Sequence, residues 1–296
     1  MTGLWEKIVA TTEKALLIGS QFPLPTDCKF IEDSSMRFFV RVLSSLHHKD
    51  RDLQKQREAE ASGKKVNPFM PYDKDLFVSD ISDTHVALLN KFNVVENHLL
   101  IITRHFESQE TLLTLRDFEA LLTCMAEYRS LGFYNGGREA GASQPHKHLQ
   151  VVPLPLAHEG PETPIDPLIE EADPKSAVGT VPGFPFLHSF VRLDHDVNAS
   201  PLRNAEERFE LYGRMLANVG MQPPDSICAR TQSKPYCFLA TPTWMLLVPR
   251  SNEFFDSISI NSLGFAGALL VRDNKQLELL RSFGPMAALK SVALPR

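Results

Sequence analysis

The spacing of apolar side chains predicts strands and helices that alternate along most of the chain. Apolar residues three and four apart are typical of a helix, whereas short apolar runs or strict alternation are typical of strands. Thr114 is a candidate N-cap with Asp117 three residues on, which gives the clearest helix signal. Helices are expected in the first twenty residues up to Gly19, over 114–131 and 205–216, and after residue 272; strands are expected over 37–43, 76–78, 86–92, 98–104, 146–152, 186–193, 238–239 and 245–248.

The order of these elements predicts an α+β fold. The runs at 86–92 and 98–104 follow each other closely, as do those at 238–239 and 245–248, which favours antiparallel pairing. We therefore expect a mainly antiparallel sheet flanked by helices, built as a single domain over 1–296. Eight prolines between 153 and 185 interrupt the pattern. They divide the expected domain into an N-terminal part (about 1–156), a proline-rich excursion (about 157–185) and a C-terminal part (about 186–296).

Composition and charge place the chain among ordinary globular proteins. Apolar residues make up 43% and the formal charge is −5, too negative for long-range attraction to nucleic acid, although a local basic pocket for a small anion is allowed. The four separated cysteines favour reduced thiols. We recognise neither a signal peptide nor a run that could cross a bilayer, and so expect a cytoplasmic protein without a membrane partner.

Candidate chemistry is concentrated in the stretch 135–150. Residues two apart on a strand face the same side, so His146, His148 and Gln150 should project together. The loop before them, 141–144, contains small and polar residues whose backbone N–H groups could form an anion site. An unprotonated imidazole can attack phosphorus, and a glutamine can donate to a phosphoryl oxygen as charge develops. Two alternatives remain open at this point: a strand-borne metal pair at His146 and His148, and a plain tight turn at the glycines.

The motif Ser-Gln-Pro-His-Lys-His-Leu-Gln at 143–150 resembles the active-site signature of diadenosine tetraphosphate phosphorylases, also called ATP adenylyltransferases. These enzymes form the transferase branch of the histidine-triad superfamily. The resemblance extends to the stretches at 90–103, 133–135, 244–250 and 261–268, in the family's order, and so covers nearly the whole chain. It implies a histidine-triad-like fold and a nucleotidyltransferase that cleaves diadenosine tetraphosphate with phosphate to give ATP and ADP.

The resemblance also implies roles for individual residues. His148 is expected to be the nucleophile that forms an adenylyl-histidine, with His146 and Gln150 completing the catalytic set. No tightly bound cofactor or protein-held metal is expected, although Mg²⁺ could accompany the nucleotide, and we expect a monomer. The expected substrate contacts are Lys55, Asn90, Lys91, Asn135, Gly141, Ala142, Ser143, Gln144, Asn261, Ser262, Leu263, Ala268 and Arg272.

Three other functions compete with this hypothesis. A hydrolase would use water to resolve the intermediate, but histidine-triad hydrolases carry a third histidine where Gln150 stands. A nucleotide-binding regulator would have lost turnover, which the intact His-x-His-x-Gln motif argues against. A metal site would use His146 and His148. No role is assigned to the remaining histidines, and Trp244 and Phe133 are expected in the core; these histidines are His47, His48, His85, His98, His105, His158, His188 and His195.

Overall fold

A computed structural model describes residues 3–44, 67–172, 178–193, 201–223 and 231–296. The predicted substrate contact Lys55, the cysteine Cys228 and the charged segment around 49–65 lie outside these residues.

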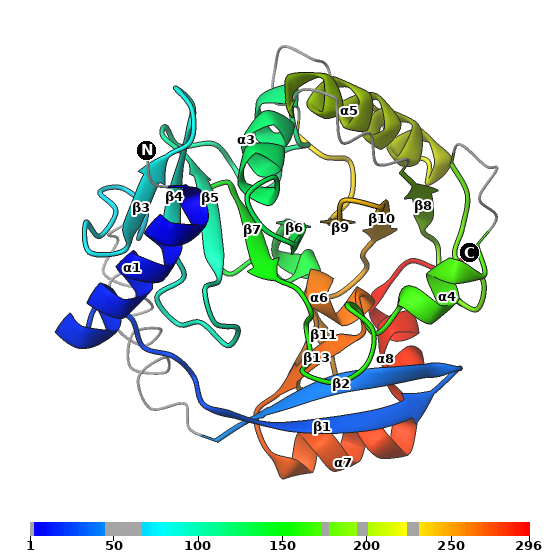
Figure 1. Cartoon of the computed structure of the whole chain (residues 1–296). Coiled ribbons are helices and arrows are strands. Elements are labelled where there is room, and N and C mark those ends of the chain that lie inside the picture. Colours follow the sequence, from blue (N-terminus) through cyan, green and yellow to red (C-terminus); the bar gives the residue numbers. More distant parts are fainter. Residues whose placement is uncertain (1–2, 45–66, 173–177, 194–200, 224–230) are drawn as a thin grey trace, which may run out of the picture.

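The centre of the fold is an eight-stranded sheet with the order β3-β4-β5-β7-β6-β9-β10-β8 (Figure 1). Every neighbouring pair in it is antiparallel. Strands from before and after the proline-rich excursion pair in this one sheet, through β6 and β9. The predicted α+β class with a mainly antiparallel sheet is therefore confirmed. The strands are β3 (Phe77–Asp80), β4 (His85–Leu89), β5 (Leu99–Thr103), β6 (Ser130–Gly136), β7 (His148–Pro153), β8 (Ser189–Arg192), β9 (Tyr236–Ala240) and β10 (Trp244–Pro249).

Three helices pack on one face of this sheet: α1 (Leu4–Ile18), α3 (Leu115–Met125) and α5 (Pro201–Asn218) (Figure 1). Leu121 on α3 and Tyr212 on α5 meet Leu149 of β7 in one buried cluster. As predicted, Gly19 ends α1 in a left-handed conformation, and Thr114 and Asp117 form a capping box at the start of α3.

A smaller layer covers part of the opposite face. It contains a three-stranded sheet in the order β1-β2-β13, in which β13 runs parallel to β2. Phe38 of β2, Phe133 of β6 and Phe265 of α6 share its apolar cluster. The elements of this layer and its connections are β1 (Thr26–Asp33), β2 (Met36–Leu43), η1 (Arg138–Ala140), α4 (Asp166–Glu170), β11 (Phe254–Phe255), β12 (Ile258–Ser259), α6 (Ser262–Phe265), β13 (Ala268–Val271), α7 (Asn274–Phe283) and α8 (Pro285–Val292).

A separate apolar cluster covers the β4–β5 end of the same face. Phe69, from the segment before β3, packs there on Leu100 and Ile102. In the register of the sheet Leu100 lies opposite Gln150 and Ile102 opposite His148. The polar side chains of β7 therefore lie between two apolar clusters, which keep them out of bulk water.

One predicted helix was too long, and one strand was missed. The helix predicted over 114–131 ends at Met125, and β6 begins at Ser130. The chain turns back because β6 packs directly under α3: a Cβ at Gly132 would lie 2.7 Å from Leu121. The strand β1 was not predicted, because it is polar and mostly half-buried or exposed, paired only with β2.

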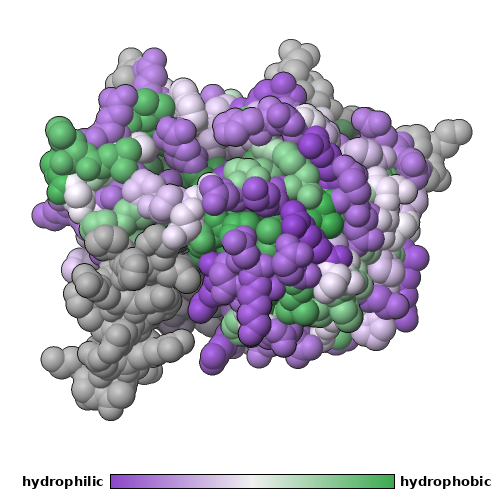
Figure 2. Space-filling model, turned by 90° about the horizontal axis from the view of Figure 1, so that it is seen from below, coloured by the Kyte–Doolittle hydropathy of each residue, from purple (hydrophilic) through white to green (hydrophobic). Residues whose placement is uncertain are grey.

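The outer surface is mixed in character. The face seen from below, which carries β1 and α7, is mainly hydrophilic with hydrophobic patches between the polar residues (Figure 2). Leu17 at the end of α1 is 88% exposed, and Phe283 at the end of α7 is 54% exposed. In the described part of the chain no helix has both the length and the apolar character that a bilayer span requires.

A buried ionic network ties β7 to the start of α3. Lys147 is fully buried, and its Nζ donates to Asp117 Oδ2 at 2.6 Å and to the Leu112 carbonyl at 3.1 Å. His85 Nε2 lies 3.0 Å from the other carboxylate oxygen. Burial alone would raise the pKa of Asp117, but the Lys147 ammonium and His85 overcome it and hold that pKa well below its usual range. This carboxylate thus anchors the strand that carries the histidines.

Replacing Asp117 should therefore destabilise the protein strongly. In Asp117→Asn the buried Lys147 ammonium keeps only the half-exposed Glu107 carboxylate, 3.4 Å from its Nζ, as a counter-charge, and the loss of the buried carboxylate costs about 3–5 kcal/mol in free energy of unfolding. Thr114→Ala, which removes only the other half of the capping box, should cost about 1 kcal/mol. Urea unfolding followed by circular dichroism measures both, and an Asp117→Asn loss no larger than that of Thr114→Ala would contradict the anchoring role.

Candidate active site

The side chains of His146, two residues before β7 begins, and of His148 and Gln150 on β7 share the face of the sheet that points away from α3. Lys147 and Leu149 lie on the other face, in the ionic network and in the cluster beneath α3. The Phe69 ring covers the histidine side, with its centroid 5.4 Å from that of His148 and 5.7 Å from that of His146. The alternation predicted from the sequence thus places all three polar side chains in one sheltered strip.

His148 presents one ring nitrogen for chemistry. Its Nδ1 donates to the carbonyl of His146 at 2.8 Å, which leaves the lone pair on Nε2. Among the residues that the structure describes, none hydrogen-bonds to this Nε2. The side chain is 4% exposed, and burial lowers the pKa of His148 to about 4 despite the hydrogen bond to His146. At neutral pH the ring is therefore an uncharged base with an open nitrogen.

His146 has a different character. Its Nε2 donates to the Thr103 carbonyl at 2.8 Å, and its Nδ1 accepts from Asn67 Nδ2 at 2.9 Å. Burial lowers the pKa of His146, so this ring is neutral as well. Because both ring nitrogens are engaged, His146 can assist His148 only through its carbonyl and through packing. That His146 belongs to the catalytic set remains a prediction.

Gln150 is oriented by His98, a histidine without a predicted role. Asn90 Nδ2 lies 3.3 Å from His98 Nδ1, and His98 Nε2 lies 3.0 Å from Gln150 Oε1. An amide nitrogen can only donate, so His98 accepts at Nδ1 and donates from Nε2 to the Gln150 oxygen. The Gln150 NH₂ group then has no hydrogen-bond partner in the described part of the chain. Two predicted residues, Asn90 and Gln150, are joined in this way.

The alternation along 98–104 could have indicated His98. It puts His98 on the same face as Leu100 and Ile102, but only the register of β5 against β7 shows which side chain His98 meets. Burial lowers the pKa of His98 to about 4, which keeps it neutral and able to accept from Asn90.

A second group of predicted residues comes together at the end of β6. Asn135 Oδ1 accepts from the backbone N–H of Ser262 at 3.0 Å and lies 2.6 Å from its hydroxyl. Asn261 caps α6 by accepting from Leu263 N–H at 3.1 Å. Gly141 packs against this turn with φ of 91°, and a Cβ there would lie 2.8 Å from that of Asn261. Only glycine allows the 141–144 loop and the α6 turn to approach so closely.

The predicted anion site in the 141–144 loop needs a correction. The N–H groups of Gly141 and Ala142 already donate to the carbonyls of Arg138 and Gly137, at 2.8 and 3.2 Å. These bonds close the turn after η1, so neither donor is open to a ligand. Anion binding by this loop is left to the residues that follow, the exposed Ser143 and the half-buried Gln144.

The remaining predicted contacts lie at the margins of this strip. Lys91 follows Asn90, is half-buried, and places its Nζ 5.5 Å from the Phe92 ring centroid. Leu263 is half-buried in α6. Ala268 begins β13 and Arg272 follows it, exposed. Their predicted roles in substrate binding remain predictions.

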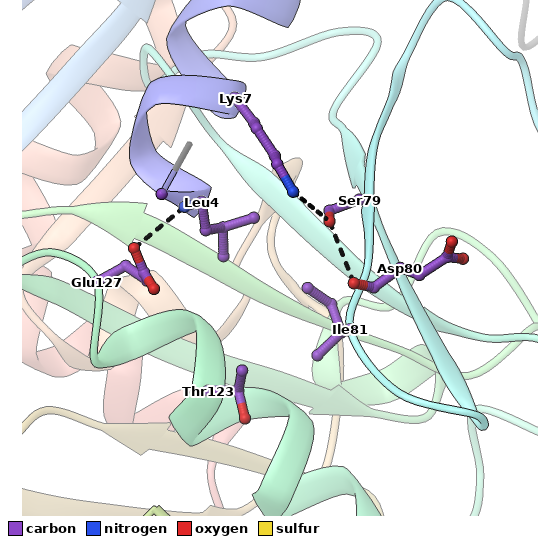
Figure 3. A pocket seen from close by; sticks show the side chains of 8 residues that line it. Leu4, Lys7, Ser79, Asp80, Ile81, Thr123 and Glu127 are labelled. Atoms are coloured by element: carbon purple, nitrogen blue, oxygen red, sulfur yellow. Dashed lines mark hydrogen bonds between the residues drawn. The ribbon is translucent and has the colours of Figure 1, made fainter. Parts of the chain in front are cut away.

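The described residues contain no metal centre, and their hollows lie outside the histidine strip. In the described ranges no group of three or more His, Cys, Asp or Glu side chains is arranged to hold a metal ion. A hollow of about 380 Å³ is lined by Pro71, Tyr72, Lys74 and Phe77. Another, of about 300 Å³, lies between the start of α1, the end of β3 and α3 (Figure 3). There Leu4 N–H donates to Glu127 and Lys7 Nζ donates to Ser79, so its polar groups largely satisfy one another.

The fold and the strip together define a class of protein: an α+β protein with a buried, neutral histidine and a glutamine on one face of an antiparallel sheet. Comparisons with known proteins give the family. The Ap4A phosphorylase N-terminal domain family matches residues 1–171, and the ATP adenylyltransferase C-terminal domain family matches residues 182–295. The chain therefore belongs to the Ap4A phosphorylase family, as the resemblance predicted, and it is a nucleotidyltransferase.

Relatives from yeast agree with this assignment. Diadenosine 5',5'''-P1,P4-tetraphosphate phosphorylase 2 of Saccharomyces cerevisiae is 28% identical over 277 residues, which cover 83% of this chain and 80% of the yeast protein. Protein APA1 of the same organism is 28% identical over 210 residues, covering 64% and 61%. The crystal structure of yeast Ap4A phosphorylase Apa2 is 25% identical, covers 100% of this chain and 95% of its own, and has a TM-score of 0.76. The crystal structure of Apa2 in complex with Ap4A is 23% identical, covers 100% of this chain and 98% of its own, and has a TM-score of 0.77. The predicted histidine-triad-like fold is thereby confirmed.

The buried neutral imidazoles predict that acid destabilises the fold. Burial lowers the pKa of His98, His148 and His188 to about 4, whereas an unfolded histidine titrates near 6.5. Stability is thus complete above about pH 6.5 and falls as the pH drops towards 4, because only the unfolded chain takes up these protons. The depressed pKa of Asp117 does not interfere, since its contribution is lost only below about pH 4.

Urea unfolding midpoints at about pH 7.5 and about pH 5 check this expectation. The midpoint should be lower at the acid pH, and His98→Gln should weaken the dependence. A midpoint that does not fall on acidification would show that these rings already carry protons in the native protein.

Proposed function

We propose that the chain catalyses the phosphorolysis of diadenosine tetraphosphate to ATP and ADP through a covalent adenylate on His148. The observation that carries this proposal is the pair of open polar atoms on β7, His148 Nε2 and the Gln150 NH₂ group. A neutral, buried imidazole nitrogen is a nucleophile, and an amide donor next to it suits a phosphoryl oxygen. The family and the name of the yeast relative, a diadenosine tetraphosphate phosphorylase, support the substrate.

In the first step, His148 Nε2 attacks the α-phosphorus of one adenylyl group. An N–P bond forms, the bridging P–O bond breaks, and ATP leaves with the electron pair. The ring becomes positively charged, and the carbonyl of His146 stabilises this charge because it accepts the Nδ1–H bond. No proton has to leave the ring, so the site needs no separate base for His148.

In the second step, an oxygen of inorganic phosphate attacks the same phosphorus. The N–P bond breaks, its electron pair returns to Nε2, and ADP forms. In both steps the Gln150 NH₂ group donates to a non-bridging oxygen as negative charge builds up on it. Gln150 has no proton to give to a leaving group, which suits transfer between phosphates better than hydrolysis.

The other predicted features belong to this proposal. Lys91 and Arg272 would offset polyphosphate charge, and any Mg²⁺ would arrive on the nucleotide. One chain is proposed to suffice, as a monomer, because Asn135 and Ser262 already meet within it. A cytoplasmic location fits the free thiols of Cys28, Cys124 and Cys237.

Brief incubation with diadenosine tetraphosphate without phosphate should leave one adenylyl group on His148. Mass spectrometry of the peptides measures this, and His148→Ala should give neither the adduct nor turnover. His188 serves as an internal control: its Nδ1 also donates to a carbonyl two residues before it, but its Nε2 accepts from Val181 N–H, so it should stay unmodified.

Product analysis separates the proposal from its rival. Cleavage should depend on added phosphate and yield ADP. AMP release at an undiminished rate without phosphate would instead identify a hydrolase, and full activity of His148→Ala would exclude the covalent mechanism.

Gln150→Glu should slow adenylylation about 100- to 1,000-fold, because it removes one donor from the transition state and adds a repelling charge. The carboxylate can still accept from His98, so the fold should be retained. Single-turnover rates with circular dichroism as the folding control check this, and an unchanged rate would mean that Gln150 does not touch the phosphoryl group.

A further inference from the structure

The sheet has an interruption beside the nucleophile. The ladder between β6 and β7 runs from Ser130↔Pro153 to Phe133↔Gln150 and stops there. Continued in the same register, it would pair Tyr134 with Leu149 and then Asn135 with His148. Asn135 and His148 instead each pair only with the strand on their other side. Asn135 pairs with Cys237 of β9, and His148 pairs with Ile102 of β5. The pairing between β6 and β7 is thus interrupted beside His148.

The side-chain amide of Gln109 fills this interruption. Its Oε1 accepts from the backbone N–H of His148 at 2.8 Å. Its Nε2 donates to the carbonyl of His148 at 3.2 Å and to that of Asn135 at 2.9 Å. The orientation of the amide is unambiguous, because one partner is an N–H group and the other two are carbonyls. Gln109 is 2% exposed, so water does not compete for these bonds.

Gln109 is itself held rigidly. Its backbone N–H donates to the Pro145 carbonyl at 2.8 Å, and its carbonyl accepts from the Tyr134 hydroxyl at 2.7 Å. The amide therefore acts as a fixed spacer between two strands that would otherwise pair directly or slide.

We infer that Gln109 is a positioning residue for adenylyl transfer, which sets the nucleophile His148 relative to the nucleotide-holding end of β6. This inference rests on the proposed function. Gln109 clamps both backbone groups of His148, so it fixes the Cα from which the imidazole projects. Through the Asn135 carbonyl it ties that Cα to the strand whose Asn135 side chain holds Ser262. A single amide thus couples the attacking atom to the predicted substrate contacts.

The expected effect is on the rate of attack and not on nucleotide affinity. A displacement of the nucleophile by about 1 Å can cost roughly 100-fold in rate, because attack requires close alignment. Gln109 reaches His148 only through backbone atoms and leaves the open Nε2 and the Gln150 amide untouched. The substrate concentration that gives half the maximal rate should therefore change far less than the maximal rate constant of adenylylation.

Two substitutions and one control test this. Gln109→Met keeps the length of the side chain and removes all three hydrogen bonds. Gln109→Glu is nearly isosteric and can still accept from the His148 N–H, but it loses both donations and places a charge against two carbonyls. Gln232→Met is the matched control, since Gln232 Nε2 donates at 2.8 Å to the next carbonyl of β6, that of Gly136, without reaching His148.

The measurement is single-turnover adenylylation of His148 over a range of diadenosine tetraphosphate concentrations. A purely structural role would lower the amplitude of adduct formation through misfolded protein, whereas a positioning role lowers the rate constant of the folded fraction. We expect a maximal rate constant reduced about 10- to 100-fold in both Gln109 variants, with half-saturation within about threefold. Gln232→Met should stay within about twofold of the wild-type rate constant.

A wild-type rate constant in either Gln109 variant would overturn the inference, and so would an equal loss in Gln232→Met. If Gln109→Met does not fold, the rate constant of Gln109→Glu decides. Failure of the wild-type protein to form any adduct is a separate result, which would remove the proposed function itself.

Discussion

The hydrogen bond between His148 Nδ1 and the carbonyl of His146 joins two residues of one short stretch of chain, two positions apart. It fixes the tautomer, so the lone pair lies on Nε2, on the open side of the ring. Nearly every other feature of the site serves this arrangement. His146 must keep its carbonyl in place, and its own ring is held at both nitrogens to do so. Burial lowers the pKa of His148, so that its Nε2 carries no proton at neutral pH.

The side chains of residues 147–150 lie alternately on two faces of the sheet with different surroundings. On the face towards α3, Lys147 is anchored by a buried carboxylate and a carbonyl. On the other face, His148 and Gln150 present open polar atoms between two apolar clusters. A strand suits this division because its side chains alternate between faces, so the anchor sits between the two histidines without crowding them. The rigidity comes from one side of the sheet and the chemistry from the other.

Much of this could be predicted from local patterns, and the rest depends on register and tertiary contact. The shared face of His146, His148 and Gln150 follows from the strand period, and the capping box from residues three apart. The partner of Gln150 could not be predicted, because His98 meets it only through the pairing of β5 with β7. Gln109 lies in an aperiodic segment, so no pattern marks it. The predicted end of the helix at residue 131 was wrong. Leu131 continues the apolar spacing of the helix, but the helix ends at Met125 because Gly132 must fit beneath Leu121.

The low pKa of His148 resolves a conflict that a polyphosphate substrate imposes. A protonated imidazole would attract the substrate but could not attack it. A neighbouring anion raises the pKa of a base by roughly 1 to 3, so a histidine of ordinary pKa would be protonated on binding. Because burial lowers the pKa of His148 to about 4, the same rise takes it to roughly 5 to 7, so at least about half of the rings stay neutral at pH 7. The buried cation next to His148 in the chain, Lys147, is turned away beneath α3 and paired with Asp117, so its charge is neutralised on the other side of the sheet.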